Sequence, residues 1–201
     1  CYRLGEIYRL GVNGVTQDGE KAARYYEDAY EGGHEKATFR LGVLYYNGEC
    51  GLVQDQEKAF SIWMKGSEAG YSGCTKNVAL CYKDGTGTAQ NFQLAIQYFE
   101  KAMSQGSIDA MLELGYAYDE NGITTPDLEK AANYYSEAYA AGSAHGAFCL
   151  GLMYENGKGV EKNEAKAFSV KVSEYNGFDS ATLSLGNISG IVVNVRGSSP
   201  Y

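Results

Sequence analysis

A leucine–glycine pair recurs along the chain at an almost constant interval. Successive anchor positions, taken as the leucine of each pair or the valine that replaces it, are 35 to 37 residues apart. In the first five copies a tyrosine stands four residues after the anchor, and small residues stand four before it in every copy that extends that far. The anchors are Leu4, Leu41, Val78, Leu114, Leu150 and Leu185. A period of this length is typical of proteins built from one supersecondary unit repeated in tandem.

An alanine keeps the same interval in the second half of each unit, and an aspartate or asparagine stands four residues before it. The side chains of these polar residues can accept hydrogen bonds from the free N–H groups of a first helical turn, so we interpret them as N-caps. In the second unit this pattern predicts one helix over residues 35–47 and another over residues 55–69. Glycines after the helices favour a helix stop. The capping positions are Asp18, Asp55, Asn91, Asp127 and Asn163.

Neither helix of a unit can bury its apolar face alone, so neighbouring units must stack. We therefore expect an all-α fold, a right-handed αα superhelix of about five two-helix repeats of 36–37 residues plus a partial helix. The repeats would occupy residues 1–189, with the partial copy anchored at Leu185, and residues 190–201 would form a non-helical tail or linker. Neither end carries a convincing polar cap, which favours a piece of a longer array. The small second residue of each pair should allow two helices to approach closely.

The unit resembles the Sel-one-like repeat (SLR) family of tetratricopeptide-related solenoids. The pattern small-x-x-x-Leu-Gly-x-x-Tyr-x-x-Gly is followed by a glycine-containing loop, Asp or Asn, and Lys-Ala-x-x-Tyr-Tyr. Lys58-Ala59 and Lys130-Ala131 follow the second half closely, whereas Val78-Ala79 departs from the Leu-Gly pair. The resemblance covers residues 1 to about 189 and implies adaptor roles in which the repeats hold partner proteins.

The net charge and the cysteines of the chain exclude further classes of function. The formal net charge is −8, and such an acidic surface repels nucleic-acid phosphates and anionic lipids. No apolar run approaches the ~20 residues that span a bilayer. We therefore predict no nucleic-acid partner and no direct membrane insertion. Cys74 and Cys81, seven residues apart on one helix, are too far apart to pair and are predicted to be small buried residues.

No pattern in the sequence is typical of catalysis, metal binding or cofactor binding. The glycines around Lys158 have the wrong spacing for a phosphate-binding loop. Gly85-Thr86-Gly87 lacks the third glycine and the preceding strand of a dinucleotide site. His34 and His145, the two histidines, are predicted at surface turns in different parts of the chain, where they form neither a metal cluster nor a nucleophile–base pair. We therefore predict no catalytic residue, no metal and no cofactor.

One face of the first helix of each unit remains unassigned once the buried positions are set aside. The residues one before, two after and five after the anchor point away from the buried face, toward the concave side of a superhelix. This stripe is basic at one end and acidic at the other, with an apolar line along its middle, as expected of a groove for a peptide or helix. Alternatively, the apolar line packs against adjacent helices and never meets a ligand. The predicted partner-binding residues are Arg40, Val43, Tyr46, Leu80, Lys83, Tyr116, Asp119, Leu152 and Glu155.

We therefore expect a non-catalytic protein–protein interaction scaffold that binds a partner peptide or helix on its concave face. Two other functions remain open from the sequence. The array can serve as a targeting or regulatory module of an enzyme domain outside this chain. It can also be a glycan-binding solenoid, because the chain contains 18 tyrosines, although most of them fall at repeat-equivalent positions that favour core packing. The sequence assigns no cellular compartment.

Overall fold

The computed structural model describes residues 1–175, which form ten α-helices, one short 3-10 helix and no strand. No helix among these residues is both long enough and apolar enough to cross a membrane. The partial copy anchored at Leu185 and the predicted tail 190–201 lie outside the described residues. The helices are α1 Tyr2–Leu10, α2 Gly19–Glu31, α3 Glu35–Asn47, η1 Glu49–Gly51, α4 Gln56–Glu68, α5 Ser72–Asp84, α6 Phe92–Ser104, α7 Ile108–Tyr118, α8 Leu128–Ala140, α9 Ala144–Asn156 and α10 Glu164–Tyr175.

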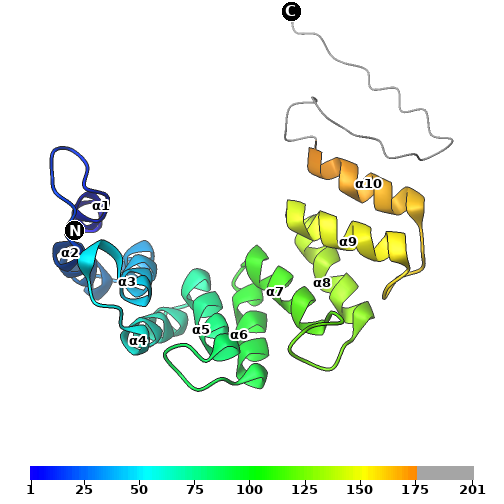
Figure 1. The fold of residues 1–201 in the computed structure, drawn as a ribbon, viewed down its shortest axis with the longest axis horizontal. Coiled ribbons are helices and arrows are strands. Elements are labelled where there is room, and N and C mark those ends of the chain that lie inside the picture. Colours follow the sequence, from blue (N-terminus) through cyan, green and yellow to red (C-terminus); the bar gives the residue numbers. More distant parts are fainter. Residues whose placement is uncertain (176–201) are drawn as a thin grey trace, which may run out of the picture.

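The helices follow one another in a curved row, and each packs mainly against the helix before it and the helix after it (Figure 1). The odd-numbered helices, called A helices here, open each repeat, and the even-numbered B helices close it. The A helices lie toward the inner side of the curve (Figure 1). The described residues therefore form five two-helix repeats, which confirms the predicted αα solenoid.

The helix boundaries follow the capping residues. Helix α3 covers the predicted residues 35–47, and α4 begins directly after its cap Asp55. Helices α1, α3, α5 and α9 each end at a glycine in the left-handed conformation, which only glycine adopts without strain. All five predicted N-caps are confirmed, because the side chains of Asp18, Asp55, Asn91, Asp127 and Asn163 accept hydrogen bonds from backbone N–H groups of the next helix at 2.8 to 3.0 Å.

The core lies between each B helix and the A helix of the next repeat. The anchors Leu41, Val78, Leu114 and Leu150 are buried there. Leu4 occupies the equivalent position but is 43% exposed. The expectation of a buried anchor is therefore wrong for Leu4, because within the described residues no B helix precedes α1 to cover it.

The second residue of each anchor pair sets the distance between the two helices of a repeat. A Cβ atom added at Gly42 would lie 2.1 Å from the indole nitrogen of Trp63, so the ring occupies the space of a side chain. In the third repeat Ala79 replaces the glycine, and the facing aromatic is Phe99, which is smaller and lacks a polar atom. The structure thus confirms that a small residue allows close approach. An aromatic ring of helix B fills the gap in the first four repeats, and the stem of Lys171 fills it in the fifth.

The cysteines behave as predicted. Cys74 and Cys81 are buried in the core of the third repeat and are not bonded to each other. Burial raises the pKa of Cys74 to about 12 and the pKa of Cys81 to about 11. Both thiols are therefore protonated at neutral pH and act as small apolar groups.

Candidate functional site: a groove along the A helices

Three pockets lie in succession along the A helices, at the last three of the four junctions between repeats. The N-terminal groove pocket, between α3 and α5, has a volume of about 250 Å³. The middle groove pocket, between α5 and α7, has about 390 Å³, and the C-terminal groove pocket, between α7 and α9, has about 450 Å³. Neighbouring pockets share lining residues, so the three form one groove along the inner side of the row.

The N-terminal groove pocket contains three of the predicted site residues. Val43, Tyr46 and Leu80 line it and are half-buried. Phe39 and Trp63 complete an apolar wall. These predicted residues therefore come together as expected, although part of each side chain also packs within the solenoid.

Arg40 lies one pocket further toward the N-terminus. It lines a hollow of about 320 Å³ with Tyr2 and Lys36, and this hollow shares Phe39 with the N-terminal groove pocket. The Arg40 Nε atom lies 3.7 Å from a carboxylate oxygen of Glu6 on α1. The structure thus places Arg40 in a hollow that continues the groove toward the N-terminus.

Tyr116 forms the ridge between the middle and C-terminal groove pockets. It lines both pockets and is 37% exposed. Lys83 lines the middle pocket, where its ammonium group lies 2.9 Å from the carboxylate of Glu113 on the next A helix. Leu152, also 37% exposed, faces Tyr116 across the C-terminal pocket. Large apolar side chains that remain this exposed are available for contact with another molecule.

Asp119 reaches the C-terminal groove pocket by a different route from the one expected. The helical pattern predicts it on the exposed face of its A helix, but α7 ends at Tyr118 and the backbone of Asp119 is extended. This repeat lacks the glycine that ends the other A helices. The Asp119 carboxylate accepts hydrogen bonds from the Tyr135 hydroxyl at 3.2 Å and from the Glu120 N–H at 2.7 Å. Asp119 therefore lines the pocket from just beyond the helix end.

Glu155 is the predicted site residue that lies outside the pockets described above. Its carboxylate pairs at 2.5 Å with the ammonium group of Lys171 on α10. The pairing directs the Glu155 side chain toward α10, the B helix of the same repeat, and not into the groove.

Ion pairs within and between repeats neutralise part of the charge along the inner side. The expected change from a basic end to an acidic end is therefore weaker than the sequence indicates, because Glu6, Glu113 and Glu155 each have a basic partner. Among the described residues, Asp84 and Asp119 line the groove without an ion pair. The groove keeps a small excess of negative charge.

Sequence reasoning missed several residues of this surface. Phe39 lines the N-terminal pocket, and Phe148 on α9 is 44% exposed. Both stand two residues before an anchor. At about 100° of rotation per residue, that position falls in the same sector as the positions two and five after the anchor. The helical periodicity alone could therefore have included them.

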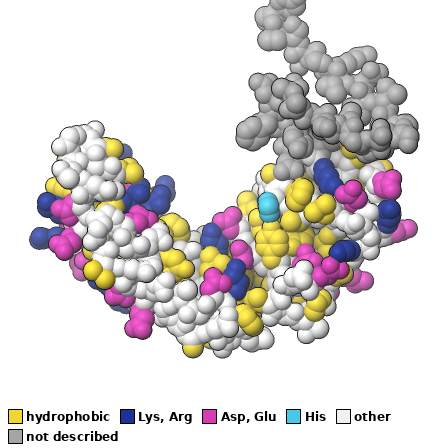
Figure 2. All heavy atoms as spheres, in the orientation of Figure 1, with side chains coloured by type: hydrophobic (Ala, Val, Ile, Leu, Met, Phe, Trp, Pro, Cys, Tyr) yellow, Lys and Arg dark blue, Asp and Glu magenta, His cyan; other side chains and the backbone are white. Residues whose placement is uncertain are grey.

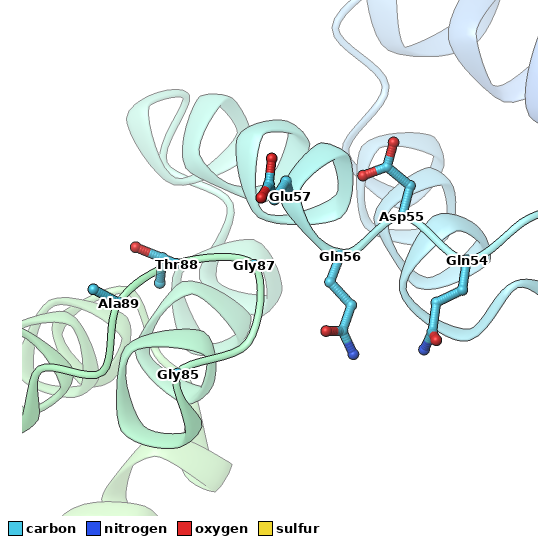
Figure 3. A pocket seen from close by; sticks show the side chains of 8 residues that line it. All are labelled: Gln54, Asp55, Gln56, Glu57, Gly85, Gly87, Thr88 and Ala89. Carbon is cyan, nitrogen blue, oxygen red and sulfur yellow. The ribbon is translucent and has the colours of Figure 1, made fainter.

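A fifth hollow, of about 570 Å³, lies between the loop before α4 and the loop between α5 and α6. The Asp55 side chain points to the opposite side from the side chains of Gln54 and Gln56 (Figure 3). Asp55 also caps α4 through a hydrogen bond from the Lys58 N–H. Among residues 1–175, no group of three or more His, Cys, Asp or Glu side chains is placed to hold a metal ion.

The tyrosines that follow each anchor are covered by neighbouring side chains. The ammonium group of Lys58 lies 3.9 Å from the centre of the Tyr45 ring, and that of Lys130 lies 4.3 Å from the Tyr118 ring. The Tyr118 ring also stacks on Tyr134, with ring centres 5.9 Å apart. These rings join the two helices of a repeat through cation–π contacts and stacking, which explains the lysine of the recurring Lys-Ala pair.

The hydrophobic side chains of the groove form a visible patch over the region of α7 to α9 on the inner side of the curve (Figure 2). A row of helix pairs with a pocketed inner side defines the class of α-solenoid repeat proteins. The Sel1 repeat matches residues 1–34, 35–71, 75–107, 108–143 and 144–169, and the chain belongs to the Sel1 repeat family. Proteins of this family generally act as protein-interaction scaffolds and are typically non-catalytic.

Solved structures of bacterial repeat proteins have the same fold. A Sel1 repeat protein from Oxalobacter formigenes is 25% identical with a TM-score of 0.77, over 89% of this chain and 72% of the other. A protective antigen of uropathogenic Escherichia coli strains that displays an SLR fold is 26% identical with a TM-score of 0.76, over 86% of this chain. The present chain spans 37% of the length of that antigen. No protein with a curated description matches the chain.

Proposed function

We propose that this chain is a non-catalytic scaffold that binds a peptide segment of a partner protein along its inner, concave side. The observation that carries the proposal is the succession of three pockets at the A-helix junctions, with Tyr116 and Leu152 exposed among them. A row of small pockets suits the successive side chains of a segment better than it suits one compact ligand.

The spacing of the helices sets the size of the segment. Successive A helices make few direct contacts, so their axes are at least as far apart as those of a packed pair, about 8–10 Å. Three successive pockets therefore extend over at least about 20 Å. An extended chain rises about 3.3 Å per residue, so about seven residues cover that distance. The acidic chain, with its net charge of −8, favours a protein partner over a nucleic acid.

The proposal is tested with a phage-displayed library of random peptides of about twelve residues, which is long enough to fill the groove. We expect the wild-type chain to enrich a set of peptides. The double substitution Leu80→Glu/Tyr116→Glu should weaken their binding at least about tenfold, because it places charge in apolar pockets. Binding is measured with synthetic copies of the enriched peptides by fluorescence anisotropy.

The matched control is Val53→Glu/Ile108→Glu, which adds the same two charges at exposed apolar residues that line none of the pockets described above. This variant should bind as the wild type does. If Leu80→Glu melts the helices, as circular dichroism would show, Leu152→Glu replaces it because Leu152 is more exposed. Failure to enrich any peptide, or equal binding by groove and control variants, would contradict the proposed function.

A further inference from the structure

The C-terminal groove pocket combines exposed apolar side chains with one carboxylate, that of Asp119, which makes no ion pair. Leu152 and Phe148 lie one helical turn apart on α9, so both side chains are on the same face of that helix. Tyr116 stands opposite, and the His145 ring connects it to Phe148 with ring centres 6.1 and 6.3 Å apart. The pocket itself is lined by aromatic and aliphatic side chains, among them Tyr116 and Leu152, and Phe148 extends this apolar surface beside it.

The carboxylate of Asp119 is held in place before any ligand arrives. Its two hydrogen bonds come from the Glu120 N–H and from the hydroxyl of Tyr135, whose side chain is only 1% exposed. An ionised carboxylate has about four lone-pair positions, so about two remain free. The fixed orientation lowers the cost of ordering this group when a donor binds.

The other charges of this pocket are already satisfied. Lys158 lies 2.6 Å from the carboxylate of Glu120, which leaves Asp119 as the charged residue of the pocket lining that makes no direct ion pair. The charge of Asp119 also helps to raise the pKa of Lys158, so this ammonium group is a neighbour of Asp119 and not its hydrogen-bonded partner. Burial raises the pKa of the Tyr116 and Tyr135 hydroxyls above the usual range for tyrosine, and nearby Asp119 adds to the shift. Partial exclusion of water strengthens electrostatic interactions in such a site.

We propose that the C-terminal groove pocket receives an arginine side chain of the partner segment, next to a large apolar side chain that packs on Leu152 and Phe148. This inference rests on the proposed function and specifies the chemistry of its ligand. The guanidinium group would donate to the Asp119 carboxylate and lie against the Tyr116 ring, while its aliphatic stem contacts the apolar wall. Arginine fits better than lysine because its planar group can stack on an aromatic ring and donate in a fork at the same time.

The test uses the enriched peptides of the random library. Arginine should be over-represented beside a large apolar residue in the peptides selected by the wild-type chain. In a synthetic copy, replacing this arginine with citrulline removes the charge and keeps the shape. We expect the substitution to weaken binding to the wild type about tenfold, but to weaken binding to Asp119→Asn less than about twofold.

The two oxygens of Asp119 accept different hydrogen bonds. Asparagine keeps one oxygen that can accept from the Glu120 N–H, and its NH2 group can donate to the Tyr135 hydroxyl oxygen. Asp119→Asn should therefore fold and show a thermal midpoint close to that of the wild type. Glu137→Gln is the control, because Glu137 is an exposed residue of α8 that lines none of the pockets described above. Glu137→Gln should bind the citrulline peptide about tenfold more weakly than the arginine peptide, as the wild type does.

The outcomes separate this inference from the proposed function. Two results would overturn the arginine assignment alone. In the first, the enriched peptides depend on Leu80 and Tyr116 but contain no arginine. In the second, replacing the arginine with citrulline weakens binding to the wild type and to Asp119→Asn by the same factor. An absence of any peptide that depends on the groove would overturn both.

Discussion

Gly42 and Trp63 show how a single residue sets the distance between two helices of this protein. The Trp63 ring is almost fully buried and lies where a side chain on Gly42 would be. Its indole N–H also donates a hydrogen bond to the Phe39 carbonyl oxygen at 3.3 Å. The ring therefore has little freedom to move aside. Packed interiors accommodate added atoms only by shifting side chains or backbone, which costs free energy.

Gly42→Ala should lower the free energy of unfolding by about 2 kcal/mol, although alanine is the better helix former. Gly73→Ala is the matched control in α5, since a Cβ there meets only the Phe39 ring, at 3.3 Å. It should change the free energy of unfolding by less than about 1 kcal/mol, because the better helix propensity of alanine and the close ring contact act in opposite directions. Urea unfolding followed by circular dichroism measures both. The double variant Gly42→Ala/Trp63→Phe should be less destabilised than the two single effects added together, as Ala79 and Phe99 coexist in the third repeat. Equal losses for Gly42→Ala and Gly73→Ala would contradict this account.

At the scale of elements, the loops after the A helices fix each repeat on the one before it. Gly87, in the loop after α5, has a φ of +69°, and a Cβ there would lie 2.1 Å from the carbonyl oxygen of Gln56. Gln56 is the first residue of α4 in the preceding repeat. This glycine therefore provides both a left-handed turn and a close contact between repeats.

Gly87→Ala should destabilise the protein more than Gly51→Ala, and the difference isolates the contact between repeats. Gly51 also has a positive φ, of +82°, but a Cβ there meets nothing within 4 Å. We expect Gly51→Ala to cost about 1 kcal/mol from backbone strain alone. Gly87→Ala should cost about 2 kcal/mol more because the backbone must also move. Thermal and urea unfolding of the two variants measure the difference, and similar costs would show that the loop contact contributes little.

The sequence predicted the elements closely because their signals are local. An N-cap such as Asp55 and a helix-ending glycine such as Gly48 act through hydrogen bonds and dihedral angles within a few residues. The groove was predicted less completely, since it depends on pairings between repeats. The ion pair of Lys83 with Glu113 and the departure of Asp119 from its helix follow from three-dimensional neighbours that a helical periodicity does not contain.

At the scale of the whole molecule, the stack has a buried interior and an uncovered first helix. Leu114 packs between α6 and the helices of its own repeat and is fully buried, whereas Leu4 has no B helix before it in the described part of the chain and is 43% exposed. The same residue type at the same repeat position therefore contributes differently to stability, according to its place in the row.

Leu114→Ala should lower the free energy of unfolding by about 3 kcal/mol, because it leaves a cavity between two helices. Leu4→Ala should cost less than about 1 kcal/mol, because much of its side chain is already in water. Chemical unfolding of the two variants provides the comparison, and each serves as the control for the other. A large loss for Leu4→Ala would mean that another surface covers this residue in solution.

Each of the three groove pockets lies at one junction between repeats, so the length of the groove depends on the number of repeats. Deleting or inserting a complete repeat would shorten or extend the reach of the groove by a single step, while the remaining contacts stay in place. An insertion of any other size would rotate the following helices and carry their inward side chains out of line. A segment bound along the groove, as proposed, would therefore gain or lose contacts in steps of one whole repeat.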